Sequence, residues 1–112
     1  MLIEFITTET GRAGLKIKTE TLNKTLLRRK VILSERKAFL ESITALEKKA
    51  AEAQEKGDED SALEHSIEMV LTMLEGITRE DFDSMDIYDI RELSEAMAEL
   101  MQNGGKAGKK KE

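Results

Sequence analysis

The chain holds one histidine, His65, and no cysteine. A single imidazole without any thiolate cannot form the usual zinc ligand sets, and thiol catalysis is excluded. Ser61 and Ser66 are near His65 in the sequence, but no strand–turn–helix pattern exposes either hydroxyl as a nucleophile. We therefore predict a solvated histidine and a protein that is not an enzyme.

The acid-rich segment DFDSMDIYDIRE, residues 81–92, has residue types that bind calcium. Asp81, Asp83 and Glu92 occupy the first, third and twelfth positions of a calcium loop. However, Met85 replaces an oxygen ligand, and Asp86 stands where glycine must make the sharp turn. Acids at successive helix N-termini explain the segment better, because the helix dipole favours them there. We predict no metal and no other cofactor.

The internal basic cluster, LLRRK at 26–30, is the feature that could attract an acidic partner. On a helix its basic side chains would fan out rather than form one patch, and no aromatic side chain lies nearby to stack on a base. The sequence NGGKAGKKK near the C-terminus lacks the spacing of a phosphate-binding loop. No specific nucleic-acid binding is predicted, whereas an acidic protein surface stays open as a partner.

Composition predicts one small, helix-rich domain. The 112 residues are 37% charged and 4% aromatic, with no proline or tryptophan, so leucine, isoleucine, methionine and alanine must build the core. No apolar run is long enough for a signal peptide or a membrane span, which makes the cytoplasm the expected location. Net charge is +4 over residues 1–56 and −12 over residues 57–105, a polarity that suits self-association or packing of one half on the other.

The N-terminal region is expected to be extended. The segments LIEFI at 2–6 and GLKIK at 14–18 flank a threonine-rich stretch with a glycine, and apolar and basic residues alternate over 15–18. This pattern predicts a β-hairpin over residues 1–18, and the alternative is an arm that docks on a partner.

The remaining periodicity predicts helices. An apolar stripe from Leu22 through Leu33 and Leu40 to Ala53 indicates one long helix over about 21–56, ended by Gly57. A second helix is expected over 60–75 and a short helical turn with a capping box at Thr78; a final helix capped by Asp86 would run to about Gln102. The predicted fold is mainly α: a small bundle of three main helices and one short helix, forming a single domain over 1–102, with a flexible Gly/Lys tail over 103–112.

The predicted working surfaces are faces rather than catalytic sites. One is the inward face of the last helix, where methionine adds adaptability; its alternative is burial in the monomer core. The other is a set of acids that could steer a partner electrostatically. The apolar candidates are Ile90, Leu93, Met97 and Met101, and the acidic candidates are Asp81, Asp83, Asp86 and Asp89.

The size, the β-like N-terminus, the helical middle, the segment LEGITREDFDSMDIYDIRELSEAMAEL at 74–100 and the glycine–lysine end together resemble the tail assembly chaperones of long-tailed bacteriophages. The resemblance implies a short protein made together with a longer form produced by ribosomal frameshifting. Both forms coat the tape-measure protein, recruit tail-tube subunits and leave before the tail is complete. It also implies action in the host cytoplasm and no catalytic residues.

The lysine-rich end, GGKAGKKK at 104–111, then acquires a second interpretation. Beyond a solvated tail with weak attraction for acidic surfaces, its glycine and lysine codons could form the slippery sequence at which a ribosome shifts frame. Two other function classes stay open. One is a small acidic regulator that mimics nucleic acid, whose binding would weaken steeply with salt. The other is an adaptor bundle whose N-terminal segment adds a strand to a partner.

Overall fold

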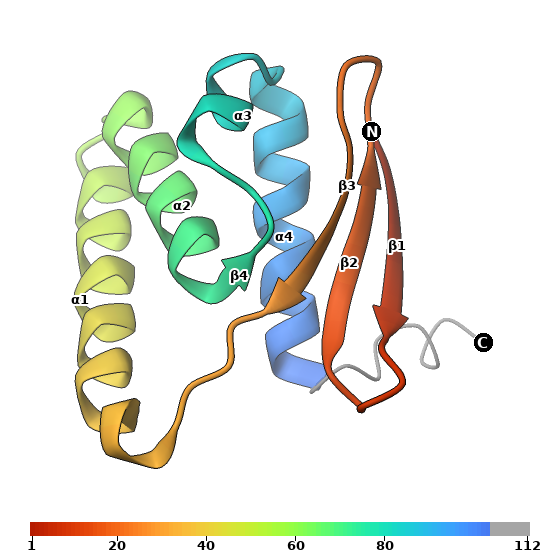
Figure 1. Ribbon diagram of the computed structural model, residues 1–112. Coiled ribbons are helices and arrows are strands. Elements are labelled where there is room, and N and C mark those ends of the chain that lie inside the picture. The colour runs from red at the N-terminus through yellow and green to blue at the C-terminus, as the bar shows by residue number, and fades with distance from the viewer. Residues whose placement is uncertain (104–112) are drawn as a thin grey trace.

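The computed structural model describes residues 1–103 and contains one antiparallel sheet with helices beside it (Figure 1). The sheet has four strands in the order β1-β2-β3-β4: β1 (Leu2–Thr7), β2 (Ala13–Lys18), β3 (Asn23–Arg28) and β4 (Leu74–Glu75). The helices are the 3₁₀ turn η1 (Leu33–Glu35), α1 (Arg36–Glu55), α2 (Glu59–Met73), α3 (Arg79–Asp83) and α4 (Ile87–Asn103). The fold is therefore α+β, and the prediction of a mainly α bundle is wrong.

The hairpin expected over residues 1–18 is present. β1 and β2 pair antiparallel from Leu2 opposite Lys18 to Thr7 opposite Ala13. At the turn the Gly11 N–H donates to the Thr8 carbonyl at 2.9 Å, and Gly11 has a φ of 86° that glycine adopts without steric cost. Ile3, Phe5, Leu15 and Ile17 of the pair pack on the core, whereas Lys16 and Lys18 are exposed, as a half-buried antiparallel sheet requires.

The long helix expected from residue 21 does not begin there, because residues 23–28 form β3. The Thr19 hydroxyl accepts hydrogen bonds from the Thr21 and Leu22 N–H groups, at 3.2 and 2.9 Å, and turns the chain back along β2. Leu26 then lies opposite Leu15, and both side chains are fully buried. Pairing and burial outweigh the weak helix propensity of this segment, since propensity is a small term that tertiary context overrides.

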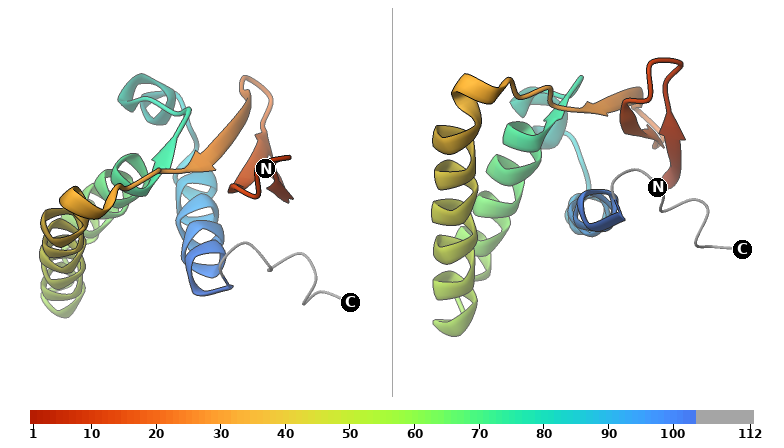
Figure 2. Two further views of the ribbon diagram at one scale, coloured as in Figure 1. Left: turned by 60° about the horizontal axis from the view of Figure 1, so that its bottom comes forward. Right: turned by 90° about the horizontal axis from the view of Figure 1, so that it is seen from below.

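The core lies between one face of the sheet and α4, with α2 beside α4 (Figure 2). β2 contributes Leu15 and Ile17, α4 contributes Leu93 and Leu100, and all of these are fully buried. Side chains from α2, α3 and the segment that joins them complete the core, namely Ile67, Val70, Leu74, Ile77 and Phe82. No large aromatic cluster is needed, because aliphatic side chains interdigitate over the whole interface.

Helices α1 and α2 form a hairpin in which α1 is the outer member (Figures 1 and 2). The predicted boundary at Gly57 is confirmed: Gly57 has a φ of 74°, and Asp58 caps α2 by accepting from the Ser61 N–H at 3.1 Å. α1 packs against α2, and of its residues only Ala53 is buried. A long helix covered on one side by a single neighbour leaves most of its surface exposed.

The connection between α2 and α4 differs from the prediction at one end. α2 ends at Met73, because Leu74 and Glu75 pair with Arg28 and Leu27 of β3. The predicted capping box of α3 is confirmed, with reciprocal bonds between Thr78 and Asp81. The final helix runs one residue beyond the prediction, to Asn103, so the tail predicted from residue 103 begins inside a helix, and its remainder, 104–112, lies outside the described residues.

Candidate functional site

The four apolar candidates share one face of α4, and that face is turned toward the core. Ile90, Leu93 and Met97 are 4%, 0% and 4% exposed, and Met101 is half-buried against the same core. The structure thus places these residues in the core of the monomer, which was the alternative to a partner surface. A partner reaches Ile90, Leu93 and Met97 only if α4 leaves the sheet.

The first acidic candidate, Asp81, connects α3 to the sheet. Lys24 lies on β3 opposite Ile17, and its ammonium donates to the Asp81 carboxylate at 2.9 Å. The same carboxylate accepts the Thr78 N–H at 2.9 Å and so caps α3. These bonds, the one from Lys24 above all, lower the pKa of Asp81 below its ordinary value. Asp81 therefore has a structural role in this fold.

The remaining acids differ in their surroundings. Asp86 accepts the Tyr88 N–H at 2.8 Å at the start of α4, as a helix cap does. The Asp89 carboxylate lies 3.4 Å from the N-terminal ammonium of Met1. Asp86 and Asp89 both line an open hollow of about 580 Å³ beside the β2–β3 turn. Asp83 is exposed at the end of α3. The four acidic candidates therefore do not form one continuous acidic surface.

The Lys24–Asp81 contact leads to a prediction on pH. Because the folded pKa of Asp81 is lowered, the stability it provides is present above the ordinary pKa of about 3.9 and is lost as pH falls through the folded value. Asp81→Asn should cost about 1 kcal/mol at pH 7, a modest figure because Lys24 is partly exposed and screened. In urea titrations the difference from the native protein should shrink below about pH 4. Asp83→Asn is the matched control, and an equal loss in both variants would contradict the assignment.

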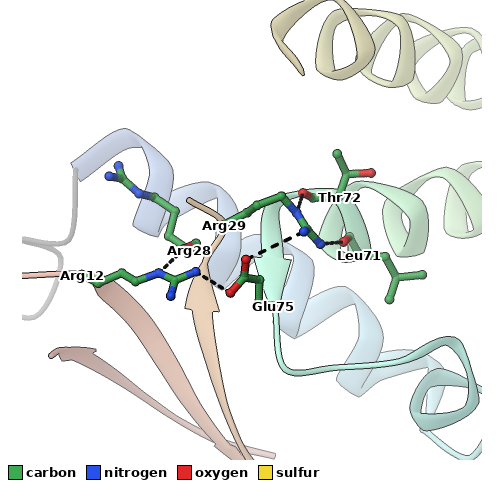
Figure 3. A network of polar contacts seen from close by, with 6 residues as sticks. All are labelled: Arg12, Arg28, Arg29, Leu71, Thr72 and Glu75. Carbon is green, nitrogen blue, oxygen red and sulfur yellow. Dashed lines mark hydrogen bonds and ion pairs between the residues drawn. The ribbon is translucent and has the colours of Figure 1, made fainter. Parts of the chain in front are cut away.

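The basic cluster at 28–29 takes part in a polar network that fastens the sheet to the helical hairpin (Figure 3). Arg29 donates to the carbonyls of Thr72 and Leu71 at 2.7 and 3.1 Å, which satisfies the C-terminal end of α2. Arg12 donates to the Arg28 carbonyl at 2.7 Å and to the Glu75 carboxylate at 2.5 Å.

Glu75 stands between the two guanidinium groups. Its other carboxylate oxygen lies 3.8 Å from Arg29, and the hydrogen bond from Arg12 is the main cause that lowers the pKa of Glu75. Residues 63 positions apart in the chain meet in this contact, so no local pattern of the sequence pointed to it. The cluster interpreted as a surface for an acidic partner is thus partly occupied by the protein's own carbonyls and carboxylate.

His65 and the serines near it are held by local contacts on α2. The His65 side chain is 22% exposed, so the expected solvated histidine is largely covered, and its Nδ1 atom lies 3.6 Å from Glu68. Ser61 bonds the Asp58 cap and Ser66 bonds the Ala62 carbonyl, so both hydroxyls are engaged locally. Within residues 1–103 no three metal-ligating side chains converge, and no helix has the length and apolar character to cross a bilayer.

Two other surfaces have features that binding sites share. The first, called here the α1 patch, consists of Ile32, Leu33 and Leu40, which are 53%, 86% and 42% exposed at the start of the helical hairpin. Leu33 and Leu40 were predicted from the sequence to belong to the apolar stripe of one long helix that began near Leu22. The structure divides that stripe: Leu26 lies in β3 and is buried, and of the residues of α1 only Ala53 is buried.

The second surface, called here the β1–α4 groove, is an open channel of about 500 Å³ between strand β1 and helix α4. Its lining contains apolar residues and glutamates. The lining residues are Ile3, Glu4, Phe5, Glu92, Glu95, Ala96 and Glu99. No local pattern of the sequence indicates this groove, because β1 and α4 are far apart in the chain.

The fold is that of a small α+β protein. No family model matches the chain, and neither the curated proteins nor the solved structures contain a match.

Proposed function

We propose that this protein is a tail assembly chaperone of a long-tailed bacteriophage, a non-enzymatic protein that binds the tape-measure protein and recruits tail-tube subunits. The observation that carries the proposal is the α1 patch, where Leu33, Ile32 and Leu40 are 86%, 53% and 42% exposed. A chaperone for an elongated, aggregation-prone partner needs such an apolar surface, accessible in the free protein. The tape-measure protein is proposed as the partner because residues 74–100 resemble the tail assembly chaperones.

The energetics of the α1 patch suit reversible capture. Burying a leucine or isoleucine side chain fully contributes roughly 1.5–3 kcal/mol, so three partly exposed side chains supply a useful fraction of a binding free energy without making it permanent. α1 is held by α2 and by the 3₁₀ turn before it, which leaves its outer surface open to a helical segment of the partner. A chaperone that must leave before assembly ends requires this intermediate affinity.

The C-terminal helix, proposed from the sequence as the apolar contact, has a different part in this proposal. Its apolar face supports the sheet, so the contact with the tape-measure protein moves to the α1 patch. Recruitment of tube subunits would then use acidic surface elsewhere, because α1 and its patch lie in the basic half of the chain.

The test is co-purification with a tape-measure protein of a long-tailed bacteriophage. Leu33→Glu with Leu40→Glu should weaken binding at least about tenfold, since each charge would have to be desolvated in the complex. Tyr88→Glu is the control, because Tyr88 is 78% exposed at the start of α4, outside the patch. Circular dichroism should show that all variants stay folded.

Two outcomes would count against the chaperone. One is a native protein that does not bind the tape-measure protein at all. The other is binding that disappears between low and physiological salt while the leucine variants behave as the native protein does, which is the behaviour expected of an acidic nucleic-acid mimic.

A further inference from the structure

We infer that this protein associates head to tail with copies of itself, so that the α1 patch of one copy packs on a second apolar patch at the start of α4 of the next copy. The second patch, called here the α4 patch, consists of Ile87 and Tyr88, which are 53% and 78% exposed. Self-association is a property of the chain alone, so the inference does not rest on the proposed chaperone function.

The first argument is the distribution of exposed apolar side chains. Six large apolar side chains are exposed among residues 1–103, and three of them form the α1 patch. Two others form the α4 patch, and the sixth, Leu2, lines the open hollow that Asp86 and Asp89 also line at the start of α4. Single exposed apolar side chains are ordinary, whereas grouped ones mark contact surfaces. The protein therefore has two candidate contact surfaces.

The second argument is that these two surfaces have opposite charge. The net charge is +4 over residues 28–40, which contain the α1 patch, and −4 over residues 79–92, which contain the α4 patch. The exposed cations Arg36 and Lys37 and the exposed acids Asp83 and Glu92 form no ion pair with another described residue. Their charges are therefore available to a second molecule, and opposite charges favour contact between the two patches.

The third argument is position. The start of α1 lies at the lower end of the molecule in Figure 1, whereas α3 and the start of α4 lie at the upper end. One copy therefore cannot bring its own two patches together. Complementary surfaces at opposite ends of a chain form a heterologous contact, in which each copy offers one patch to each of two neighbours.

The charges also argue against contacts between like patches. Two α1 patches facing each other would bring Arg36 and Lys37 of both copies together, and two α4 patches would do the same with Asp83 and Glu92. Like charges placed opposite each other in an interface weaken it. A partner that covers one patch leaves the other exposed, whereas copies of this chain cover both. The second copy is for these reasons the occupant that the surfaces fit.

The contact is small, so it should be reversible. Five partly exposed apolar side chains form the two patches, which is less apolar surface than a permanent interface buries. Because the proposed chaperone function uses the same α1 patch, a bound tape-measure segment would exclude the neighbouring copy. Capture of the partner and self-association therefore compete for one surface.

The experiment is sedimentation velocity of the full-length protein over about 5–500 μM. The weight-average sedimentation coefficient should rise with concentration beyond the value of a dimer, because a heterologous contact does not close at two copies. The rise should be smaller at about 0.5 M salt than at about 0.05 M salt. A native protein that stays monomeric over the whole range would overturn the inference.

Variants of each patch show which surfaces meet. Leu33→Glu with Leu40→Glu, and separately Ile87→Glu with Tyr88→Glu, should each abolish the rise, since a carboxylate in the contact would lose its hydration. All four side chains are exposed in the monomer, so circular dichroism should show native folding. Contact between like patches predicts instead that one of the two double variants associates as the native protein does.

An equimolar mixture of the two double variants is the decisive sample. Each variant keeps one intact patch, so the mixture should form a one-to-one pair although neither variant associates alone. A mixture that stays monomeric would contradict the head-to-tail contact. The Ile87→Glu, Tyr88→Glu variant should still bind the tape-measure protein, which separates this result from the test of the chaperone.

Charge reversal tests the electrostatic part. Arg36→Glu with Lys37→Glu should weaken self-association at least about tenfold, and adding Asp83→Lys with Glu92→Lys to the same chain should restore it to within about threefold. Lys48→Glu with Lys49→Glu is the matched control, because it changes the net charge equally at exposed positions of α1 beyond the patch. Equal weakening by this control, or no restoration in the fourfold variant, would overturn the pairing of the two patches.

Discussion

Glutamate in place of Met97 is expected to unfold the protein. Met97 is 4% exposed and belongs to the core cluster, so a carboxylate there would lose its hydration without gaining a partner. The expected cost is about 4 kcal/mol or more, which is a large part of the roughly 5–15 kcal/mol that stabilises a typical domain. Circular dichroism and thermal melting would show the loss of the native transition.

The matched control is Tyr88→Glu on the same helix. The Tyr88 side chain is 78% exposed, and the substitution should change the free energy of unfolding by less than about 0.5 kcal/mol. A folded Met97→Glu variant with a native melting temperature would show that the inner face of α4 is not core. In that case the original assignment of Ile90, Leu93, Met97 and Met101 to a partner surface would regain support.

Alanine in place of Gly76 is expected to have the second largest effect. Gly76 has a φ of 105°, a conformation that side chains of L-residues rarely adopt. A Cβ atom at this position would also lie 2.5 Å from the Thr25 carbonyl oxygen, a backbone atom that cannot move aside without shifting β3. Strain and overlap together should cost about 3 kcal/mol, measured by urea unfolding.

Gly57→Ala separates the two causes of this loss. Gly57 has a φ of 74°, but a Cβ atom there would meet nothing within 4 Å. Only the backbone strain remains, and the cost should be about 1 kcal/mol. Equal losses at the two glycines would mean that the close approach of Gly76 to β3 contributes nothing.

Local signals in the sequence were sufficient for the hairpin and for most helix ends. Alternation over residues 15–18 indicated β2, and Gly57 with Asp58 marked the junction of α1 and α2. Thr78 indicated its capping box, and Asp86 caps the start of α4 as expected. Each of these features depends on residues within four positions of one another, so the amino-acid sequence of a short segment is enough to predict it.

The third strand was missed because its cause is not local. Leu22 and Leu26 are four residues apart, a spacing that also fits a helix, but residues 23–28 form a strand because they pair with β2. β4 is the clearest case: a pair of residues near the end of α2 joins β3 across nearly half of the chain. These omissions turned an α+β fold into a predicted bundle.

The candidate sites follow the same division. That Ile90, Leu93 and Met97 form one apolar face was evident from their spacing, but the presence of a sheet against that face decided that they are core. Likewise, Glu92 and Glu95 were visible as acids of an amphipathic helix, and only the position of β1 beside them makes a groove.

The sequence by itself determined the helix caps, the turns, the apolar faces and the charge distribution, because each arises from interactions within a few residues or from composition. The tertiary structure decided which apolar face is buried, which strand lies at the edge, and how Arg12, Arg29 and Glu75 meet. The physical reason is that burial and strand pairing depend on what another part of the chain presents, and their free energies exceed local propensities.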